Sequence, residues 1–313
     1  MSAGFSTPIL FIIFNRLDIT RRAFEVIRKI QPARLYIASD GPQENQINEE
    51  SQVKAVRAYV MGNIDWECKV ETLFREKNLG CGLGPSLAIS WLFEHEEEGI
   101  ILEDDCLADL SFFPFCRDLL EKYRTDRRVM VISGNNFLQR KNFRPPESYF
   151  FLKYPNTWGW ATWKRAWKYF DIKMEKWPQA RENKTLAKTL DPNEYFLWQR
   201  DLDDVFLGKI TGVWDFQWVF TCWMQETLAI SPTVNLVSNI GFGDESTHTK
   251  GYDPLRANLP TRSIGFPLIH PKNVVANRQA EKLMQDIFYH MPMWPYFRLL
   301  LKERMGLGRL VKK

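Results

Sequence analysis

The sequence predicts an α/β fold in which a mostly parallel central sheet is flanked by helices. Two observations support this. Short, continuously apolar runs, such as residues 8–14 and 99–102, have the composition of strands buried on both faces. Stretches with helical spacing of apolar residues lie between these runs, so that strands and helices alternate from residue 8 to about 106. The chain has 313 residues, of which 45% are hydrophobic, and can therefore bury a full core.

The elements follow one another in a β-α-β-α-β-α-β order. The first strand is followed by a helix over residues 19–30, with Asp18 or Thr20 as its N-cap. We expect the remaining elements of this half to be strands at 34–38, 67–74 and 99–102 and helices at 49–61 and 85–97. A helix at 112–124 and a strand at 129–132 come next. This order predicts parallel strands joined by right-handed crossovers.

The character of the sequence changes after Asn136, where aromatic residues and longer loops become frequent. Residues 1–136 are therefore interpreted as an α/β half. We expect residues 137–270 to form a second half packed on the same sheet and residues 271–313 to form a basic, partly amphipathic tail. The spacing of three, four and three residues predicts one helical stripe of aromatic side chains: Trp160, Trp163, Trp167 and Phe170.

Three consecutive carboxylates, Glu103, Asp104 and Asp105, follow the apolar run at 99–102. Such a triplet is costly unless a cation or hydrogen-bond donors neutralise it. It lies where open α/β sheets bind their ligands, at the carboxyl end of a strand. Carboxylate oxygens suit Mg²⁺ or Mn²⁺, which proteins commonly share with substrate phosphates. The alternative is a solvated acidic turn.

Two more polar side chains follow predicted strands. Arg16 comes after the first strand and is a candidate to pair with a phosphate, whereas Asp40 comes after the second and is a candidate to accept from a base or ribose. Their alternatives are an ion pair with a helix acid and a turn cap, respectively. Taken with the triplet, they favour a nucleotide site. Glycines at 80, 82 and 84 match neither the P-loop nor the dinucleotide-binding signature.

Asp215 lies among large aromatic residues in the segment Trp-Asp-Phe-Gln-Trp at 214–218. Apolar surroundings favour a carboxylate that acts as a general base near neutral pH. The alternative is that Asp215 caps the following helix. Asn135, Trp158 and Trp160 are candidates for acceptor or sugar contact, although the stripe spacing of Trp160 is more typical of a core position.

A glycine-bounded polar loop at 241–251 has the composition of a lid, in which His248 and Lys250 are candidates to contact a diphosphate. A loop with no ligand role is the alternative. The tail from residue 280 combines apolar and basic side chains and is a candidate for peripheral membrane association. Here the alternative is a terminal helix docked on the body.

Composition limits the class of protein and the cellular compartment that we expect. The net charge of +4 does not demand nucleic acid, and five cysteines without CxxC spacing are typical of a reducing compartment. No stretch approaches 18 apolar residues, so no membrane-spanning segment is expected. These features favour a cytoplasmic protein, at or near the inner face of the membrane if the tail binds there.

The order of these motifs resembles the GT-A glycosyltransferases, in particular the branch of N-acetylglucosaminyltransferase I and its bacterial homologues. The resemblance spans roughly residues 8–250 and rests on the strand that ends in Asn-Arg at 15–16, Ser-Asp-Gly at 39–41 and the acidic triplet. It extends to Val-Ile-Ser-Gly-Asn-Asn at 131–136, Trp-Gly-Trp at 158–160 and Trp-Asp at 214–215. The eukaryotic members carry a membrane anchor and lumenal stem, and we expect neither here, which argues against a Golgi role.

The resemblance implies an inverting hexosyl- or N-acetylhexosaminyltransferase that uses a nucleotide-diphosphate sugar, typically UDP-linked, and Mn²⁺ or Mg²⁺. Asp105 matches the direct metal ligand, Asp104 its ribose- or metal-side neighbour, and Glu103 a donor-sugar contact. Arg16 and Asp40 match nucleotide contacts, and Asp215 matches the catalytic base. The resemblance further implies that residues 1–136 bind the nucleotide sugar and that residues 137–270 form the acceptor and catalytic half. The implied acceptor is a glycan or lipid-linked molecule. Two other functions stay open: a sugar nucleotidyltransferase and a non-enzymatic carbohydrate-binding protein.

Overall fold

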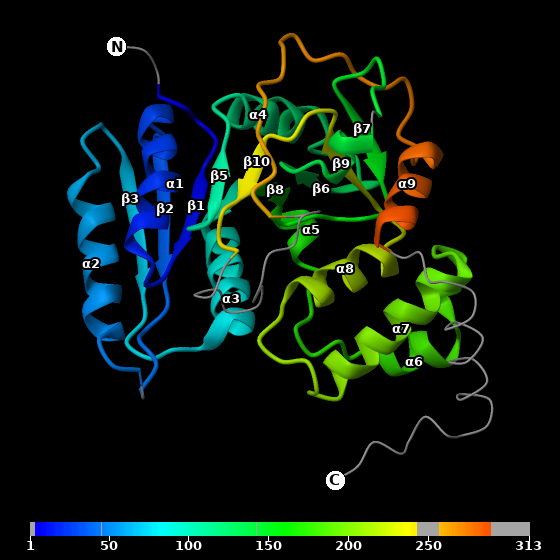
Figure 1. The fold of residues 1–313 in the computed structure, drawn as a ribbon, viewed down its shortest axis with the longest axis horizontal. Helices are drawn as coiled ribbons and strands as arrows, with labels where there is room; N and C mark the ends of the chain where they lie inside the picture. Colours follow the sequence, from blue (N-terminus) through cyan, green and yellow to red (C-terminus); the bar gives the residue numbers. More distant parts are fainter. Residues whose placement is uncertain (1–3, 45, 142, 243–256, 289–313) are drawn as a thin grey trace.

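The computed structural model describes residues 4–44, 46–141, 143–242 and 257–288. Its main sheet has eight strands in the order β3-β2-β1-β4-β8-β6-β9-β7, and β10 and β5 form a separate antiparallel pair (Figure 1). Strand β1 pairs in parallel with β2 and β4, as do β2 with β3 and β6 with β9. Strands β8 and β7 run antiparallel to their neighbours. The predicted α/β class with a mostly parallel sheet is confirmed.

The strands are β1 (Ile9–Ile13), β2 (Arg34–Ser39), β3 (Lys69–Phe74), β4 (Glu98–Glu103), β5 (Cys106–Ala108), β6 (Val129–Ser133), β7 (Tyr149–Leu152), β8 (Trp160–Trp163), β9 (Leu228–Pro232) and β10 (Val237–Asn239). The α-helices are α1 (Leu17–Ile30), α2 (Glu49–Gly62), α3 (Gly80–His95), α4 (Phe112–Lys122), α5 (Lys164–Trp167), α6 (Trp177–Glu182), α7 (Pro192–Phe206), α8 (Asp215–Met224) and α9 (Arg278–Phe288). Two short 3₁₀ helices are η1 (Phe137–Lys141) and η2 (Thr185–Lys188).

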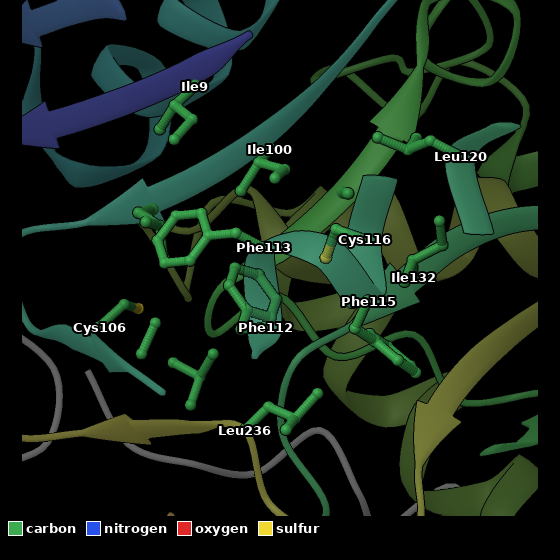
Figure 2. Packing of buried hydrophobic residues seen from close by; sticks show 14 of the residues in the cluster. Ile9, Ile100, Cys106, Phe112, Phe113, Phe115, Cys116, Leu120, Ile132 and Leu236 are labelled. Carbon is green, nitrogen blue, oxygen red and sulfur yellow. The ribbon is translucent and has the colours of Figure 1, made fainter. Parts of the chain in front are cut away.

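The sheet separates two hydrophobic cores because successive strand residues point to opposite faces. Ile9, Phe11 and Ile13 of β1 pack on the face covered by α1, α2 and α4. Leu10, between them, packs on the face covered by α3, α5 and α8. Figure 2 shows part of the first core, where aromatic side chains of α4 lie close to Ile100 of β4.

A third cluster joins one face of β7 to α6, α7, α8 and α9. Helix α8 is buried on two sides: Trp218 faces the sheet, and Val219, Phe220 and Trp223 face the third cluster. Strands from both predicted halves, before and after residue 136, therefore belong to one sheet.

The helix predicted for the aromatic stripe is wrong at its start, because Trp160–Trp163 forms strand β8 between β4 and β6. A spacing of three residues places two side chains on one face of a helix but on opposite faces of a strand. Trp160 accordingly lies in the core beside α3, and Trp163 lies in the core beside α4. Tryptophan and threonine favour strands when neighbouring strands can pair with them.

Two other boundaries differ from expectation. Helix α3 begins at Gly80 rather than Pro85, so that Pro85 lies inside it, and α1 begins with Arg16 as its N-cap rather than Asp18 or Thr20. His248, Lys250 and the tail from residue 289 lie outside the described residues. Within the described ranges, no helix combines the length and the apolar character that crossing a bilayer requires.

Candidate active site: two cavities

The first cavity lies at the carboxyl ends of β1, β2 and β4 and has a volume of about 290 Å³. Parallel strands direct these ends to one edge of the sheet, where α/β proteins bind ligands. The cavity is lined by four residues that the sequence singled out: Arg16, Asp40, Glu103 and Asp104. The topology therefore gathers these predicted donor-site residues in one place.

Arg16 is the counter-ion of the acidic triplet. Its guanidinium donates to Asp104 Oδ1 at 2.5 Å and to Asp105 Oδ2 at 3.0 Å. Burial opposes the charge of Arg16, but the two carboxylates outweigh it and raise its pKa above the ordinary value. Arg16 therefore forms an ion pair, as the alternative interpretation expected. Its partners are acids of the triplet rather than an acid of a helix.

The triplet carries more negative charge than Arg16 neutralises. Burial raises the pKa of Glu103, and the charges of Asp105, Asp104 and Asp215 raise it further. Burial likewise raises the pKa of Asp104, although Arg16 pulls it down. Asp104 Oδ2 is buried without a hydrogen-bond partner. An oxygen in that position, beside a surplus of carboxylates, favours the binding of a cation.

The residues fit a divalent cation held jointly with a ligand better than one enclosed by protein. Among the residues that the structure describes, no three His, Cys, Asp or Glu side chains gather as a complete metal-binding group. Mg²⁺ typically takes one or two carboxylates and completes its octahedron with water and substrate phosphates. Asp105 and the free oxygen of Asp104 supply such a partial set.

Asp105 is held in place by a segment distant in sequence, at the end of β10. Asn239 Nδ2 lies 3.4 Å from Asp105 Oδ1, and the Ile240 N–H donates to the Asp105 carbonyl at 2.9 Å. Gly241 packs so tightly against this carboxylate that a Cβ there would lie 2.1 Å from Oδ2. Sequence reasoning missed these contacts, which no local pattern signals.

Asp40 serves the turn that leads into α3. Its Oδ2 accepts from the N–H groups of Leu79 at 2.8 Å and Gly80 at 2.9 Å. Burial raises the pKa of Asp40, and these N–H groups oppose that rise. The turn-capping interpretation is therefore correct for Oδ2, while the residue also lines the cavity.

Polar residues that were not candidate site residues also line this cavity. Asn15 Nδ2 donates to Glu49 Oε1 at 2.9 Å, and Glu49 Oε2 accepts from the Gln43 N–H at 2.6 Å. Arg75 also lines the cavity. The sequence offered one signal that Asn15 lines the cavity, namely its position after the first strand and next to Arg16.

The second cavity has a volume of about 420 Å³ and is lined by three candidate residues: Asn135, Trp158 and Asp215. Its lining residues belong to the segments after β6 and β7 and to α7, α8 and α9. Sequence reasoning missed the wall formed by α7 and α9. Side chains from the missed elements are Leu197, Trp198, Arg200, Asp201, Met284 and Phe288.

Two glycines bring the segments of Asn135 and Trp158 together. The Gly134 N–H donates to the Gly159 carbonyl at 2.7 Å, and a Cβ on Gly134 would lie 2.6 Å from that oxygen. Gly159 has φ of +61°, which glycine adopts without strain. The close approach explains why both motifs contain glycine next to a candidate site residue.

Trp160 does not reach the cavity. It is 0% exposed and packs against Trp167, Trp214 and Trp218 at ring separations of 5.8–6.2 Å. The expectation that it contacts a sugar is corrected: the strand buries its ring, whereas Trp158, two residues earlier, lines the cavity.

Asp215 is the first residue of α8, and the N-cap is Trp214, so the capping alternative is wrong by one residue. A carboxylate in the first turn is stabilised by the helix dipole. Its charge also raises the pKa of Glu103, which lines the other cavity. The carboxylates of Asp215 and Glu103, each of which lines a different cavity, are therefore close enough to interact electrostatically.

No protein-family model and no curated protein matches this chain. Some solved structures are similar to it at low sequence identity. The mannosyltransferase PcManGT from Pyrobaculum calidifontis, in complex with GDP-Man and Mn²⁺, is 13% identical over 51% of this chain and 45% of that chain, with a TM-score of 0.34. The galactosyltransferase LgtC is 13% identical over 91% and 98%, with a TM-score of 0.36.

A UDP-glucose pyrophosphorylase in complex with UDP-glucose is 14% identical over 52% of this chain and 78% of that chain, with a TM-score of 0.31. The chain spans less than half the length of the mannosyltransferase. Similarities of this extent do not assign an activity.

Proposed function

We propose that this chain is a GT-A-type glycosyltransferase that moves a sugar from a nucleotide-diphosphate donor, UDP-linked, to an acceptor hydroxyl with inversion. The observation that carries the proposal is a pair of unlike cavities whose carboxylates, Glu103 and Asp215, interact electrostatically. One is acid-rich and lies at the carboxyl ends of parallel strands, and the other is aromatic and holds a single helix-terminal carboxylate. A two-substrate transfer needs such neighbouring sites, because donor and acceptor must meet in a fixed geometry.

The first cavity is proposed to bind the donor. Asp40 and Asn15 would face the nucleoside, and Glu103 would face the sugar, since its carboxylate interacts electrostatically with Asp215 of the second cavity. Arg16 would hold Asp104 and Asp105 in position. Asp105, with Asp104 beside it, would hold Mn²⁺ or Mg²⁺, whose chemistry when bound is to neutralise charge on a leaving diphosphate.

The second cavity is proposed to bind the acceptor. Asp215 would accept the proton of the attacking hydroxyl, which then forms a bond to the anomeric carbon as the bond to the diphosphate breaks on the opposite face. One displacement inverts the configuration. Trp158 and Asn135 would position the acceptor, and His248 and Lys250 remain proposed diphosphate contacts outside the described residues.

The test is a product assay with UDP-glucose, UDP-galactose, UDP-N-acetylglucosamine and GDP-mannose, each with Mn²⁺ and with a chelator. The proposal predicts release of a nucleoside diphosphate from at least one donor, dependent on the metal. Conversion of the donor to a nucleoside triphosphate on addition of pyrophosphate would instead identify a nucleotidyltransferase. Binding without turnover of any donor would contradict an enzymatic role.

A further inference from the structure

A separate cavity, with a volume of about 500 Å³, lies at the edge of the sheet opposite the first cavity. Strand β8 runs antiparallel to both β4 and β6, so β4 and β6 run in the same direction. The first cavity lies at the carboxyl ends of β1, β2 and β4, whereas this one is lined by residues that precede β6 and β9 and by residues of α5 and the turn after it. The described lining residues are shared with neither of the two cavities of the proposed reaction.

The charged side chains described in the lining of this cavity are all basic: Arg124, Arg127, Arg165 and Lys168. We call it the basic cavity. Arg124 is neutralised by Glu98 and Glu121, whose oxygens lie 3.0 and 2.6 Å from its guanidinium. The other three basic side chains form no ion pair with any residue that the structure describes.

Asp126 is an acid close enough to act on the basic cavity, but Arg128 already holds it. Arg128 donates to Asp126 Oδ1 through Nε at 3.0 Å and to Oδ2 through a terminal nitrogen at 2.6 Å. Burial lowers the pKa of Arg165, Asp126 opposes this fall, and the charge of Arg127 adds to it. The cavity therefore has an excess of positive charge, and a cleft lined by one sign of charge attracts counter-ions.

Arg165 presents a guanidinium that is fixed in place. Its Nε donates to the Arg124 carbonyl at 2.7 Å, and its Nη2 donates to the carbonyls of Tyr123 and Val129 at 2.8 and 3.0 Å. Its central carbon lies 4.2 Å from the centroid of the Trp163 ring. Nη1 makes no hydrogen bond to the described residues and keeps its N–H groups for a ligand. An immobilised guanidinium loses little conformational entropy when it binds an oxyanion.

The charge and the size of the basic cavity favour a phosphate monoester. Such a group carries roughly 1.5–2 negative charges at pH 7, whereas a carboxylate carries one, so the ester better matches several cations. The volume lies within the range of roughly 300–1,000 Å³ that is typical of small-molecule sites, which leaves room for an organic group beside the phosphate. Tyr169 lines the cavity, is 41% exposed and offers that group an aromatic face.

From these observations we infer that the basic cavity binds a phosphate monoester, with Arg127, Arg165 and Lys168 as its cationic contacts. The ester can be a small soluble molecule or the headgroup of a lipid, which share this chemistry. The inference does not depend on the proposed sugar transfer, because the site lies at the opposite edge of the sheet.

The test is a calorimetric titration of glycerol 3-phosphate, and separately of acetate, in phosphate-free buffer that contains a chelator. We expect saturable binding of the phosphate ester, with an affinity at least about tenfold higher than that of acetate. The double substitution Arg127→Gln and Lys168→Gln is expected to weaken binding by at least about tenfold, because it removes two charged donors. Both side chains are exposed, so the variant is expected to fold and to keep the wild-type Tm.

The matched control is Arg22→Gln combined with Lys188→Gln. It changes the net charge equally at exposed positions that do not line the basic cavity, and it is expected to keep the wild-type affinity. Equal affinity for acetate and the phosphate ester, undiminished binding in the first double variant, or an equal loss in the control would overturn the inference.

A second arm of the experiment separates the two sources of the phosphate. The protein is sedimented with vesicles of phosphatidylcholine alone and of phosphatidylcholine with phosphatidic acid, whose headgroup is a phosphate monoester. Binding of the phosphatidic acid vesicles without binding of glycerol 3-phosphate would support a lipid as the source, provided that Arg127→Gln with Lys168→Gln abolishes it. Binding of neither probe would overturn the inference.

Discussion

Replacing Gly241 by alanine is expected to displace Asp105. The added Cβ would lie 2.1 Å from Asp105 Oδ2 and 2.8 Å from its Cβ and Cγ. Real Cβ atoms essentially never come within 3.0 Å of another heavy atom, so the carboxylate oxygen must move by at least about 0.9 Å, the difference between these distances. The same oxygen accepts from Arg16, so the ion pair must move with it.

The cost follows from this displacement. Overpacking of a buried contact costs roughly 1–3 kcal/mol. For a chain of 313 residues, that is a fall in Tm of about 2–5 °C. A misplacement near 1 Å at a reacting site reduces turnover by up to about 100-fold. Both effects arise from one methyl group placed beside a predicted metal ligand.

The assay is a pair of thermal melts, without and with UDP and Mn²⁺, together with diphosphate release. Gly62→Ala is the control, because that glycine ends α2 and a Cβ added there would meet no atom within 4 Å. The control is expected to keep the wild-type Tm and turnover. Wild-type melting and wild-type stabilisation by UDP and Mn²⁺ in Gly241→Ala would refute the tight contact between Gly241 and Asp105.

Two further substitutions test separate parts of the molecule. Asp215→Asn should retain UDP affinity by calorimetry while turnover falls by at least ~100-fold, because the amide cannot accept the proton; near-normal turnover would exclude Asp215 as the base. Lys153→Met should destabilise the protein by about 3–5 kcal/mol in urea unfolding. The substitution removes the ammonium group that lies 2.8 Å from the buried carboxylate of Glu194, and so leaves that carboxylate without its ion-pair partner. Adding Glu194→Gln should recover part of that loss, and no recovery would argue against the ion pair as the cause.

The first half of the fold was predictable because its signals are local. Apolar runs mark the strands, helical spacing marks the crossovers, and parallel connectivity then brings Arg16, Asp40 and Glu103 to one edge. The same reasoning failed at Trp160–Trp163, where a spacing of three residues is compatible with one helix face or with both faces of a strand. Pairing with β4 and β6, which lie far away in sequence, decides between them.

Much of the site depends on such distant contacts. Asn239 reaches Asp105 across 134 positions of the sequence. Helix α9, which the sequence assigned to a tail, forms a wall of the second cavity through Met284 and Phe288. It is held there by Glu281, whose Oε1 accepts from the Lys153 N–H at 2.9 Å. Pattern and spacing carry no information on contacts of this kind, which arise only when the cores pack.

The most direct test of the proposed donor site is a calorimetric titration of UDP into the wild-type protein and into Asp105→Ala, each with Mn²⁺ and with a chelator. We predict saturable, metal-dependent binding at one site in the wild type and its loss in Asp105→Ala, because Asp105 and the diphosphate would share the cation. Undiminished binding in the variant, or equal binding of UDP with Mn²⁺ and with the chelator, would contradict the assignment of this edge of the sheet to a metal-assisted donor site.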